Sequence, residues 1–258
     1  MGRCKDIQIR VIPSSIANPF VKKVHYSGKV VNNSFLHLGA FLDGDLHGVM
    51  SFGPSMDKRK LIGLVRGTEW NGFIELNRMA FDDYLPRNAE SYCIGKAIRM
   101  IRKQAPHVKW IVSFADGTQC GDGTIYRASN FLLTGITANK TIIEMPDGSA
   151  IAGLTLDLQS PTIKARYDRM CGLDPTKHYN RSDYIRGGAK PKKGYMLRYV
   201  YFVDPKWRER LTVPPIPFSK IDEIGAGMYK GENSPQSVRH AKVTEHPDRE
   251  PKGPEIEK

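Results

Sequence analysis

The chain has 258 residues, 40% of them hydrophobic, which is enough for one packed domain, or for one domain with a substantial extension. Its formal charge of +12 favours an acidic partner, nucleic acid first, although a basic pI alone is also found in proteins that bind no nucleic acid. The sequence argues against a disulfide framework, a zinc knuckle, a membrane-spanning helix and a signal peptide, because no apolar run approaches ~20 residues and the cysteines are scattered: Cys4, Cys93, Cys120 and Cys171.

The first fifty residues predict a strand, a short helix and a hairpin. Residues 7–12 alternate weakly, as in a strand, and residues 18–25 are typical of a short helix. Residues 36–52 form two apolar runs separated by Asp43-Gly44-Asp45, and glycine tolerates the positive φ of a tight turn. This pattern predicts an antiparallel hairpin.

The middle of the chain predicts alternating strands and helices. A strand over 72–81 is followed by a helix that Ser91 can cap and that must stop before Pro106. A second strand over 109–115 runs into a glycine-rich loop, and a helix over 124–130 and a strand over 131–136 follow. This order puts a loop and a helix N-terminus beside the ends of two adjacent strands, which suits a phosphate-bearing donor.

Basic charge is concentrated in residues 161–211, where 13 Lys and Arg stand against 5 Asp and Glu. Six tyrosines are interleaved with it: Tyr167, Tyr179, Tyr184, Tyr195, Tyr199 and Tyr201. This mixture favours phosphate contacts and base stacking, and the alternative is an extension whose tyrosines pack on the core. We expect a core over 1–160, a basic extension over 161–231 that packs on it and contacts DNA, a flexible basic loop at 187–194, and a disordered tail over 232–258.

Several strings are long and unusual enough to carry a resemblance. They are VHYSGKVVNNSFLHLGAF (24–41), FGPSMDKRKLIGLVRGTEWNGFIELNRMAF (52–81), LPRNAES (85–91), SFADGTQCGDGTIYRASNF (113–131) and LRYVYFVDPKWRERLTVPPIPFSKIDEIGAGMYKG (197–231). Together they closely resemble the Mom DNA-modification proteins of Mu-like phages. The similarity covers most of the chain except the tail.

The resemblance implies an α+β, GNAT-like acyltransferase fold with a mixed, mostly antiparallel sheet flanked by helices. It also implies a transferase that converts adenine in double-stranded DNA to a carbamoylmethyl (methylcarbamoyl) derivative and so protects phage DNA from host restriction. Such a protein would act in the cytoplasm of the bacterial host, without a membrane, and a homodimer is one assembly to consider. The donor stays open between acetyl-CoA and another activated small-molecule or aminoacyl donor, because RNAES (87–91) stands where GNAT enzymes carry a glycine-rich pyrophosphate motif.

The resemblance also assigns roles to six residues. It implies that His25, Tyr26 and Asp116 take part in activity, with His25 and Tyr26 in an iron site to which Asp116 could be added as a ligand. It implies that Arg78, Ser91 and Tyr126 bind the donor.

Chemistry from the residues themselves leaves alternatives beside these roles. A carboxylate that accepts an amine hydrogen would activate adenine, and Asp116 is the first candidate and Glu75 the second. Asp116 could equally cap its own turn, and Glu75 could be half of a structural pair with Arg78. Tyr126 could protonate a leaving group or lie in the core, Ser91 could simply cap its helix, and a lone histidine such as His25 is commonly structural.

Two other functions fit the same sequence. One keeps the fold but changes the acceptor to a modified pyrimidine in DNA, a free amine or tRNA. The other is a non-catalytic DNA-binding protein, for which the basic segment alone would suffice.

Overall fold

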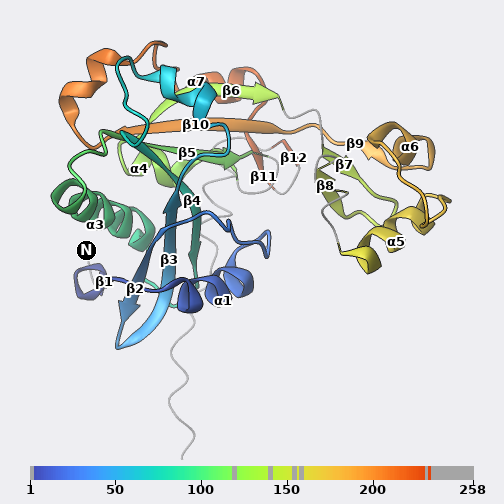
Figure 1. Cartoon of the computed structure of the whole chain (residues 1–258), viewed down its shortest axis with the longest axis horizontal. Coiled ribbons are helices and arrows are strands. Elements are labelled where there is room, and N and C mark those ends of the chain that lie inside the picture. Colours follow the sequence, from blue (N-terminus) through green and yellow to red (C-terminus); the bar gives the residue numbers. More distant parts are fainter. Residues whose placement is uncertain are drawn as a thin grey trace, which may run out of the picture.

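The computed structural model describes residues 3–117, 121–138, 142–152, 156, 160–229 and 232–233. Its centre is a seven-stranded sheet with the order β1-β2-β3-β4-β5-β10-β6 (Figure 1). The strands are β1 (Gln8–Val11), β2 (Leu36–Leu42), β3 (Asp45–Gly53), β4 (Phe73–Phe81), β5 (Trp110–Asp116), β6 (Leu132–Ala138) and β10 (Tyr195–Phe202). Only β4 and β5 pair in parallel, and every other pair is antiparallel. The predicted α+β class with a mixed, mostly antiparallel sheet is therefore confirmed.

Helices cover both faces of this sheet. The helices are α1 (Ser14–Val24), α2 (Lys58–Leu61), α3 (Ala89–Gln104), α4 (Thr124–Ala128) and α7 (Ser219–Glu223), with 3-10 turns η1 (Arg3–Asp6), η2 (Ile62–Leu64) and η4 (Pro205–Arg210). The apolar residues of α3 pack with Leu38, Met50 and Ile111 in the largest core cluster. On the opposite face, α1 packs against Val49 and Ala80, and α2 and η2 pack against Phe73 and Trp110. We call this second surface the α1/α2 face.

Local patterns predicted most of these elements, with shifts at their ends. The hairpin forms as expected, with Asp43 and Gly44 at positive φ. Helix α1 begins at Ser14, four residues earlier than predicted, because burial of Ala17 and Val21 against the sheet stabilises its first turns. No helix within the described ranges is long and apolar enough to cross a membrane.

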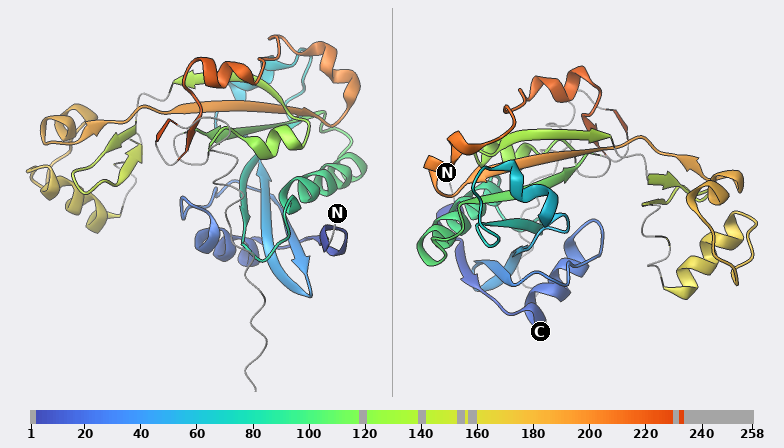
Figure 2. Two further views of the ribbon diagram at one scale, coloured as in Figure 1. Left: turned by 180° about the vertical axis from the view of Figure 1, so that it is seen from behind. Right: turned by 45° about the horizontal axis from the view of Figure 1, so that its top comes forward.

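A small lobe projects from one end of the sheet (Figures 1 and 2). It consists of β7 (Ile142–Glu144), β8 (Ala150–Ala152), α5 (Pro161–Met170), α6 (Arg181–Arg186) and β9 (Lys190–Pro191). The three strands form their own sheet in the order β8-β7-β9. Ile143, Met145 and Tyr184 are buried in a separate hydrophobic cluster inside it. A further pair, β11 (Met228–Tyr229) and β12 (Glu232–Asn233), is antiparallel.

The structure divides the predicted extension between the lobe and the sheet. Residues 161–191 belong to the lobe, but β10 lies between β5 and β6, with Leu197, Tyr199 and Val200 fully buried. Apolar residues lie on both faces of β10, which is typical of a strand in the interior of a sheet. Apart from Glu232–Asn233, the predicted tail lies outside the described residues.

Candidate functional site

Strands β4 and β5 separate shortly after they meet. Their parallel pairing covers only Phe73 to Glu75 on β4, although both strands continue beyond it. On its other edge, β4 carries a bulge: Ser51 pairs with Arg78 and Phe52 with Leu76, so that Asn77 is an extra residue. Bulges bend a strand and re-aim its side chains, and they are common beside functional sites. Polar groups gather at this point.

Glu75 lies at the end of the parallel pairing, next to the bulge. Burial raises the pKa of its carboxyl, while hydrogen bonds from Ser55 and Asn77 and the charge of Arg78 act in the opposite direction. Ser34 donates its hydroxyl to Asn77 Oδ1 at 3.1 Å. A carboxylate with a raised pKa is a better proton acceptor near neutral pH than an ordinary one.

Arg78 lies near Glu75 and contacts the segment that follows α1. Its Nε donates to the carbonyl of Lys29 at 2.9 Å and its Nη1 to the carbonyl of Asn77 at 2.7 Å. Burial, with a smaller effect of Arg78, lowers the pKa of His25 to about 4, so this histidine is neutral at pH 7. We call Ser34, Ser55, Glu75, Asn77, Arg78 and His25 the bulge cluster.

The sequence-predicted residues fall into four places, the bulge cluster, the end of β5, α4 and α3. His25, Glu75 and Arg78 come together in the bulge cluster, and Tyr26 is adjacent, with its exposed ring 4.3 Å from that of His25. Asp116 ends β5, on the other arm of the divergence, where its Cα pairs with that of Met196.

The structure decides between two of the structural alternatives for Tyr126 and Ser91, while their roles in donor binding stay predictions. Tyr126 is buried on α4, with its ring 5.2 Å from that of Tyr199 and 5.4 Å from that of Phe131, so it is part of the core. Ser91 does not cap α3, because the helix already begins at Ala89. Asn88 is the cap residue at φ 68°, with no side-chain cap bond, and Ser91 Oγ donates to its carbonyl at 3.1 Å.

The described residues around His25 do not form a metal site made of His, Cys, Asp and Glu ligands alone. His25 Nδ1 lies 2.8 Å from Ser27 Oγ and also accepts the amide of Ser27 at 3.2 Å. The described ranges contain no group of three His, Cys, Asp or Glu side chains that could hold a metal ion. Tyr26, which the resemblance adds as a ligand, is not one of these residue types, so the iron site stays a prediction.

A cavity of about 260 Å³ opens on the α1/α2 face beside the bulge cluster, and the sequence did not reveal it. Its apolar wall is formed by Phe35, Pro54, Phe73 and Ile74, and its polar rim by Lys58, Asn71 and His107. Large apolar side chains are exposed in the same segments: Phe35 is 66% exposed, Met56 92% and Trp70 54%. Met56 and Trp70 lie in the motif 52–81, where aromatic and basic residues are interleaved, and this was the sequence feature that could have indicated the surface.

The tyrosines of the basic segment have a structural role. Tyr184 and Tyr199 are fully buried, and the other four pack against hydrophobic clusters. Full burial leaves Tyr184 and Tyr199 no free face for base stacking. Tyr195, Tyr199 and Tyr201 pack on the main core, as the alternative expected, whereas Tyr167, Tyr179 and Tyr184 pack in the lobe's own cluster. Contact of this segment with DNA stays a prediction. Lys190–Pro191 is paired with β7, so the predicted flexible loop at 187–194 contains a strand.

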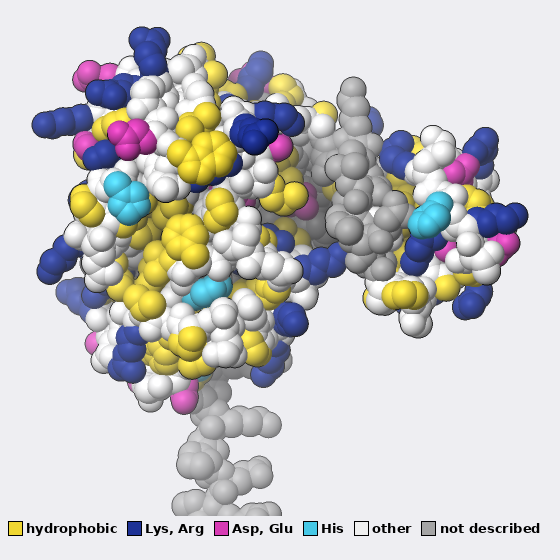
Figure 3. All heavy atoms as spheres, in the orientation of Figure 1, with side chains coloured by type: hydrophobic (Ala, Val, Ile, Leu, Met, Phe, Trp, Pro, Cys, Tyr) yellow, Lys and Arg dark blue, Asp and Glu magenta, His cyan; other side chains and the backbone are white. Residues whose placement is uncertain are grey.

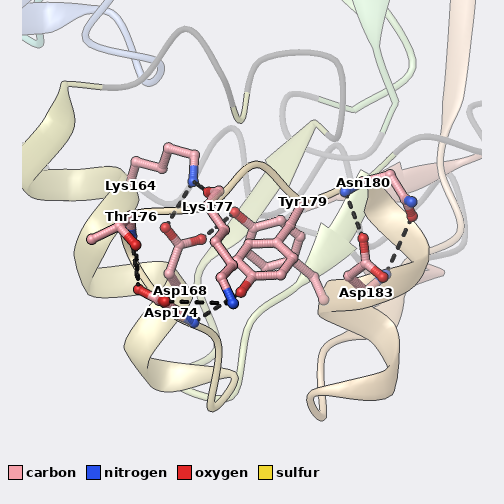
Figure 4. A network of polar contacts seen from close by, with 9 residues as sticks. Lys164, Asp168, Asp174, Thr176, Lys177, Tyr179, Asn180 and Asp183 are labelled. Carbon is pink, nitrogen blue, oxygen red and sulfur yellow. Dashed lines mark hydrogen bonds and ion pairs between the residues drawn. The ribbon is translucent and has the colours of Figure 1, made fainter.

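Many charged side chains of the lobe form ion pairs with one another. Lys164 donates to the fully buried Asp168 at 2.7 Å, and Asp168 also accepts the hydroxyl of Tyr184 (Figure 4). Four more pairs lie within the lobe, Arg166–Asp147, Lys177–Asp174, Arg186–Asp183 and Lys192–Glu144. Asn180 and Asp183 cap α6 reciprocally (Figure 4).

Comparisons with known proteins identify relatives over most of the chain. The model of the Mom protein family matches residues 6–220. The methylcarbamoylase Mom of Escherichia phage Mu is 35% identical over 209 residues, which cover 81% of this chain and 80% of that protein.

Solved acetyltransferases are more distant. An N-acetyltransferase from Staphylococcus aureus Mu50 is 10% identical with a TM-score of 0.43, covering 76% of this chain and 98% of its own. The IAA acetyltransferase from Bacillus cereus is 11% identical with a TM-score of 0.42, covering 76% of this chain and 99% of its own. These likenesses are too weak to carry an argument about chemistry.

Proposed function

The chain belongs to the Mom protein family, and from this we propose that it is a transferase that attaches a methylcarbamoyl group to adenine in double-stranded DNA. The observation that carries the proposal is the 35% identity to a phage methylcarbamoylase over four fifths of the chain. The modified DNA would resist host restriction nucleases. We assign this reaction to the bulge cluster.

The acceptor sets two demands on the protein. The exocyclic amine of adenine is a weak nucleophile and is inaccessible within a duplex, so the base must be extruded at a cost of a few kcal/mol. When the amine nitrogen bonds to the methylene carbon of the donor, the donor's leaving group departs with its electron pair and the nitrogen must lose a proton.

We assign the acceptance of that proton to the carboxylate of Glu75. Burial raises the pKa of this group, and Ser55 and Asn77 orient it. Arg78 lies close enough to lower the pKa of His25 and to stabilise the charge of Glu75, so it can also stabilise charge that develops on the donor. Asp116, on the arm formed by β5, is the second candidate for the base.

The donor is proposed to approach from the α3 side, between the diverging β4 and β5. Helix α3 begins without a side-chain cap, and its first-turn amides suit a phosphate-bearing donor, although Glu90 in the same turn acts against an anion. The carbamoylmethyl product requires a donor whose leaving group is on the methylene carbon, because attack at the carbonyl of a coenzyme A thioester or an aminoacyl ester would release the thiol or the alcohol and leave an amide on adenine.

Mass spectrometry of nucleosides after expression in a bacterium tests the proposal. Wild type should yield deoxyadenosine with the added mass of a methylcarbamoyl group, and the DNA should resist restriction digestion. We expect Glu75→Gln to lower the modified fraction at least about 100-fold, because a general base contributes roughly 10²–10⁴-fold. Glu223→Gln, at an exposed carboxylate on α7, is the matched control and should behave as wild type.

The same digest separates the alternatives. Loss of modification in Asp116→Asn but not in Glu75→Gln would move the base to the β5 arm. Added mass on another nucleoside would establish the reading with a different acceptor. Unmodified DNA with tight DNA binding by wild type would favour a non-catalytic DNA-binding protein.

A further inference from the structure

We propose that the cavity bounded by Phe35, Phe73 and Lys58 receives the extruded adenine, and that Trp70 and Met56 fill the gap that the base leaves in the duplex. This inference rests on the proposed function, because it supplies the acceptor subsite of that reaction. Its occupant is an unstacked purine of a DNA duplex.

The position of the cavity beside the bulge cluster is the first argument. Phe73 and Glu75 project from the same side of β4, two residues and therefore about 7 Å apart along the strand. The other walls also adjoin the cluster, since Phe35 follows Ser34 and Pro54 precedes Ser55. Glu75 does not line the cavity itself, but three of its walls are next to residues of the bulge cluster in sequence or along β4, so a base held there lies beside Glu75.

The size and lining of the cavity fit a single base. A volume of about 260 Å³ lies just below the roughly 300–1,000 Å³ of pockets for drug-sized ligands, so it suits one ring system better than a longer ligand. Flipped bases stack between aromatic and apolar side chains and are recognised through hydrogen bonds to their edges. The exposed ring of Phe35 provides the stacking face, the buried ring of Phe73, which stacks on Trp110, closes the floor, and Asn71 and Lys58 provide the donors.

Lys58 links the cavity to the exposed apolar residues. Its Nζ donates to Asn71 Oδ1 at 3.3 Å and lies 4.8 Å from the centre of the Trp70 ring. Exposed apolar side chains next to a cavity mark an interaction surface, and proteins that distort DNA insert such side chains between base steps. Trp70 and Met56 are placed for that role at the rim.

Charge complementarity identifies DNA as the partner of this surface. The segment 56–71 carries Lys58, Arg59, Lys60 and Arg66 against Asp57 and Glu69. The η4 turn, with Arg208 and Arg210, packs beside it, since the amide of Arg66 donates to the carbonyl of Arg210 at 2.8 Å. In Figure 3, hydrophobic side chains gather across the middle of this face, with Lys and Arg around them. An apolar centre with a basic rim fits an open base within a phosphate backbone.

Fluorescence of 2-aminopurine tests the subsite without any donor. A set of duplexes would each carry one 2-aminopurine opposite thymine, with different flanking bases, and each would be titrated with the full chain. Wild type should raise the fluorescence of at least one duplex several-fold, because the analogue brightens when it leaves the stack. Phe35→Ala and Trp70→Ala should each lose most of this rise. Tyr84→Ala, at an exposed ring that stacks on His47 instead, is the matched control and should keep it.

The outcomes separate this inference from the proposed function. A full rise with Phe35→Ala and Trp70→Ala would overturn the subsite, even if wild type modifies adenine in cells. Modified adenine without any rise in fluorescence from wild type would also overturn it. A rise that depends on Phe35 and Trp70, in a chain that leaves adenine unmodified, would support the subsite and refute the transferase. Circular dichroism of each variant excludes loss of the fold as the cause.

Discussion

The lobe, taken as residues 142–193, and the α1/α2 face of the sheet contain the same kinds of residue in opposite arrangements. In the lobe, Tyr184 is buried and five basic side chains pair with acidic neighbours. On the α1/α2 face, Phe35 and Trp70 are exposed beside a cavity, and the side chains of Arg59 and Arg66 are exposed too.

This difference teaches that composition does not distinguish a binding surface from a structural one. Interleaved tyrosine and basic residues predicted DNA contact over 161–211, where the tyrosines pack in the lobe's own cluster or on the main core. What distinguishes the two regions is whether each charge is paired and whether each ring is covered. The following predictions test that distinction.

The largest expected effect is a loss of stability in the lobe. Asp168→Asn removes the charge that pairs with Lys164 and weakens the hydrogen bond from Tyr184, and it should lower the unfolding free energy of the lobe by about 3 kcal/mol. Hydrogen exchange of the amides in 161–191 measures it. Asp174→Asn, at a half-exposed partner of Lys177, is the control and should cost under about 1 kcal/mol.

Adenine modification by Asp168→Asn shows whether this carboxylate has a structural role or a role in the reaction. At a temperature where Asp168→Asn remains folded, its modified fraction should equal that of wild type. A large fall in modification without faster exchange would show that the buried carboxylate acts in the reaction, and the contrast between the two regions would then fail.

The second effect concerns DNA affinity. Replacing Arg59, Arg66 and Arg208 with glutamine should weaken duplex binding about tenfold near 0.15 M salt and reduce the salt slope by about 2–3, because each phosphate contact contributes nearly one counterion. The matched lobe variant replaces Arg169, Lys190 and Lys193, which are also exposed. Fluorescence anisotropy over a salt series measures both. A larger loss in the lobe variant would return the main DNA contact to the predicted basic extension.

The smallest effect is a pH dependence of stability that comes from His25. Its folded pKa of about 4 lies below the ordinary histidine value of 6.5, so between these pH values the unfolded chain binds a proton that the folded chain does not. Stability from this residue is therefore complete above pH 6.5 and is lost as the pH falls toward 4. Denaturant titrations at pH 7 and 4.5 should show that His25→Gln removes on the order of 1 kcal/mol of this loss. His178→Gln, at an exposed histidine of the lobe, should leave it unchanged.

The sequence predicted those parts of the fold that short-range patterns determine. The hairpin, β4, α3 and β5 follow from turn chemistry and from apolar periodicity, and each forms close to its expected range. The place of β10 between β5 and β6 depends on pairing across at least 57 residues, which local patterns do not encode. For the same reason, burial of Tyr199 could not be distinguished from exposure.

The candidate site was predicted in part. The resemblance identified His25 and Arg78, and strand alternation identified Glu75, and these three lie in one cluster. The bulge at Asn77 and the cavity beside Phe35 were missed, because both arise from the meeting of separate segments rather than from any motif. Ser91 was mistaken for a cap because Asn88, at positive φ, starts α3 earlier.

The two connections between the lobe and the sheet allow the lobe to be replaced without a change in the sheet. Its two connections leave from adjacent antiparallel strands, since the Cα of Ala138 pairs with that of Tyr195. The lobe is thus an elaborated hairpin connection, and the entropy of closing such a connection grows only slowly with its length. Insertions, deletions or wholesale replacement between these two residues leave the register of β6 and β10 intact. Related chains can therefore diversify this part of the molecule while the bulge cluster stays unchanged.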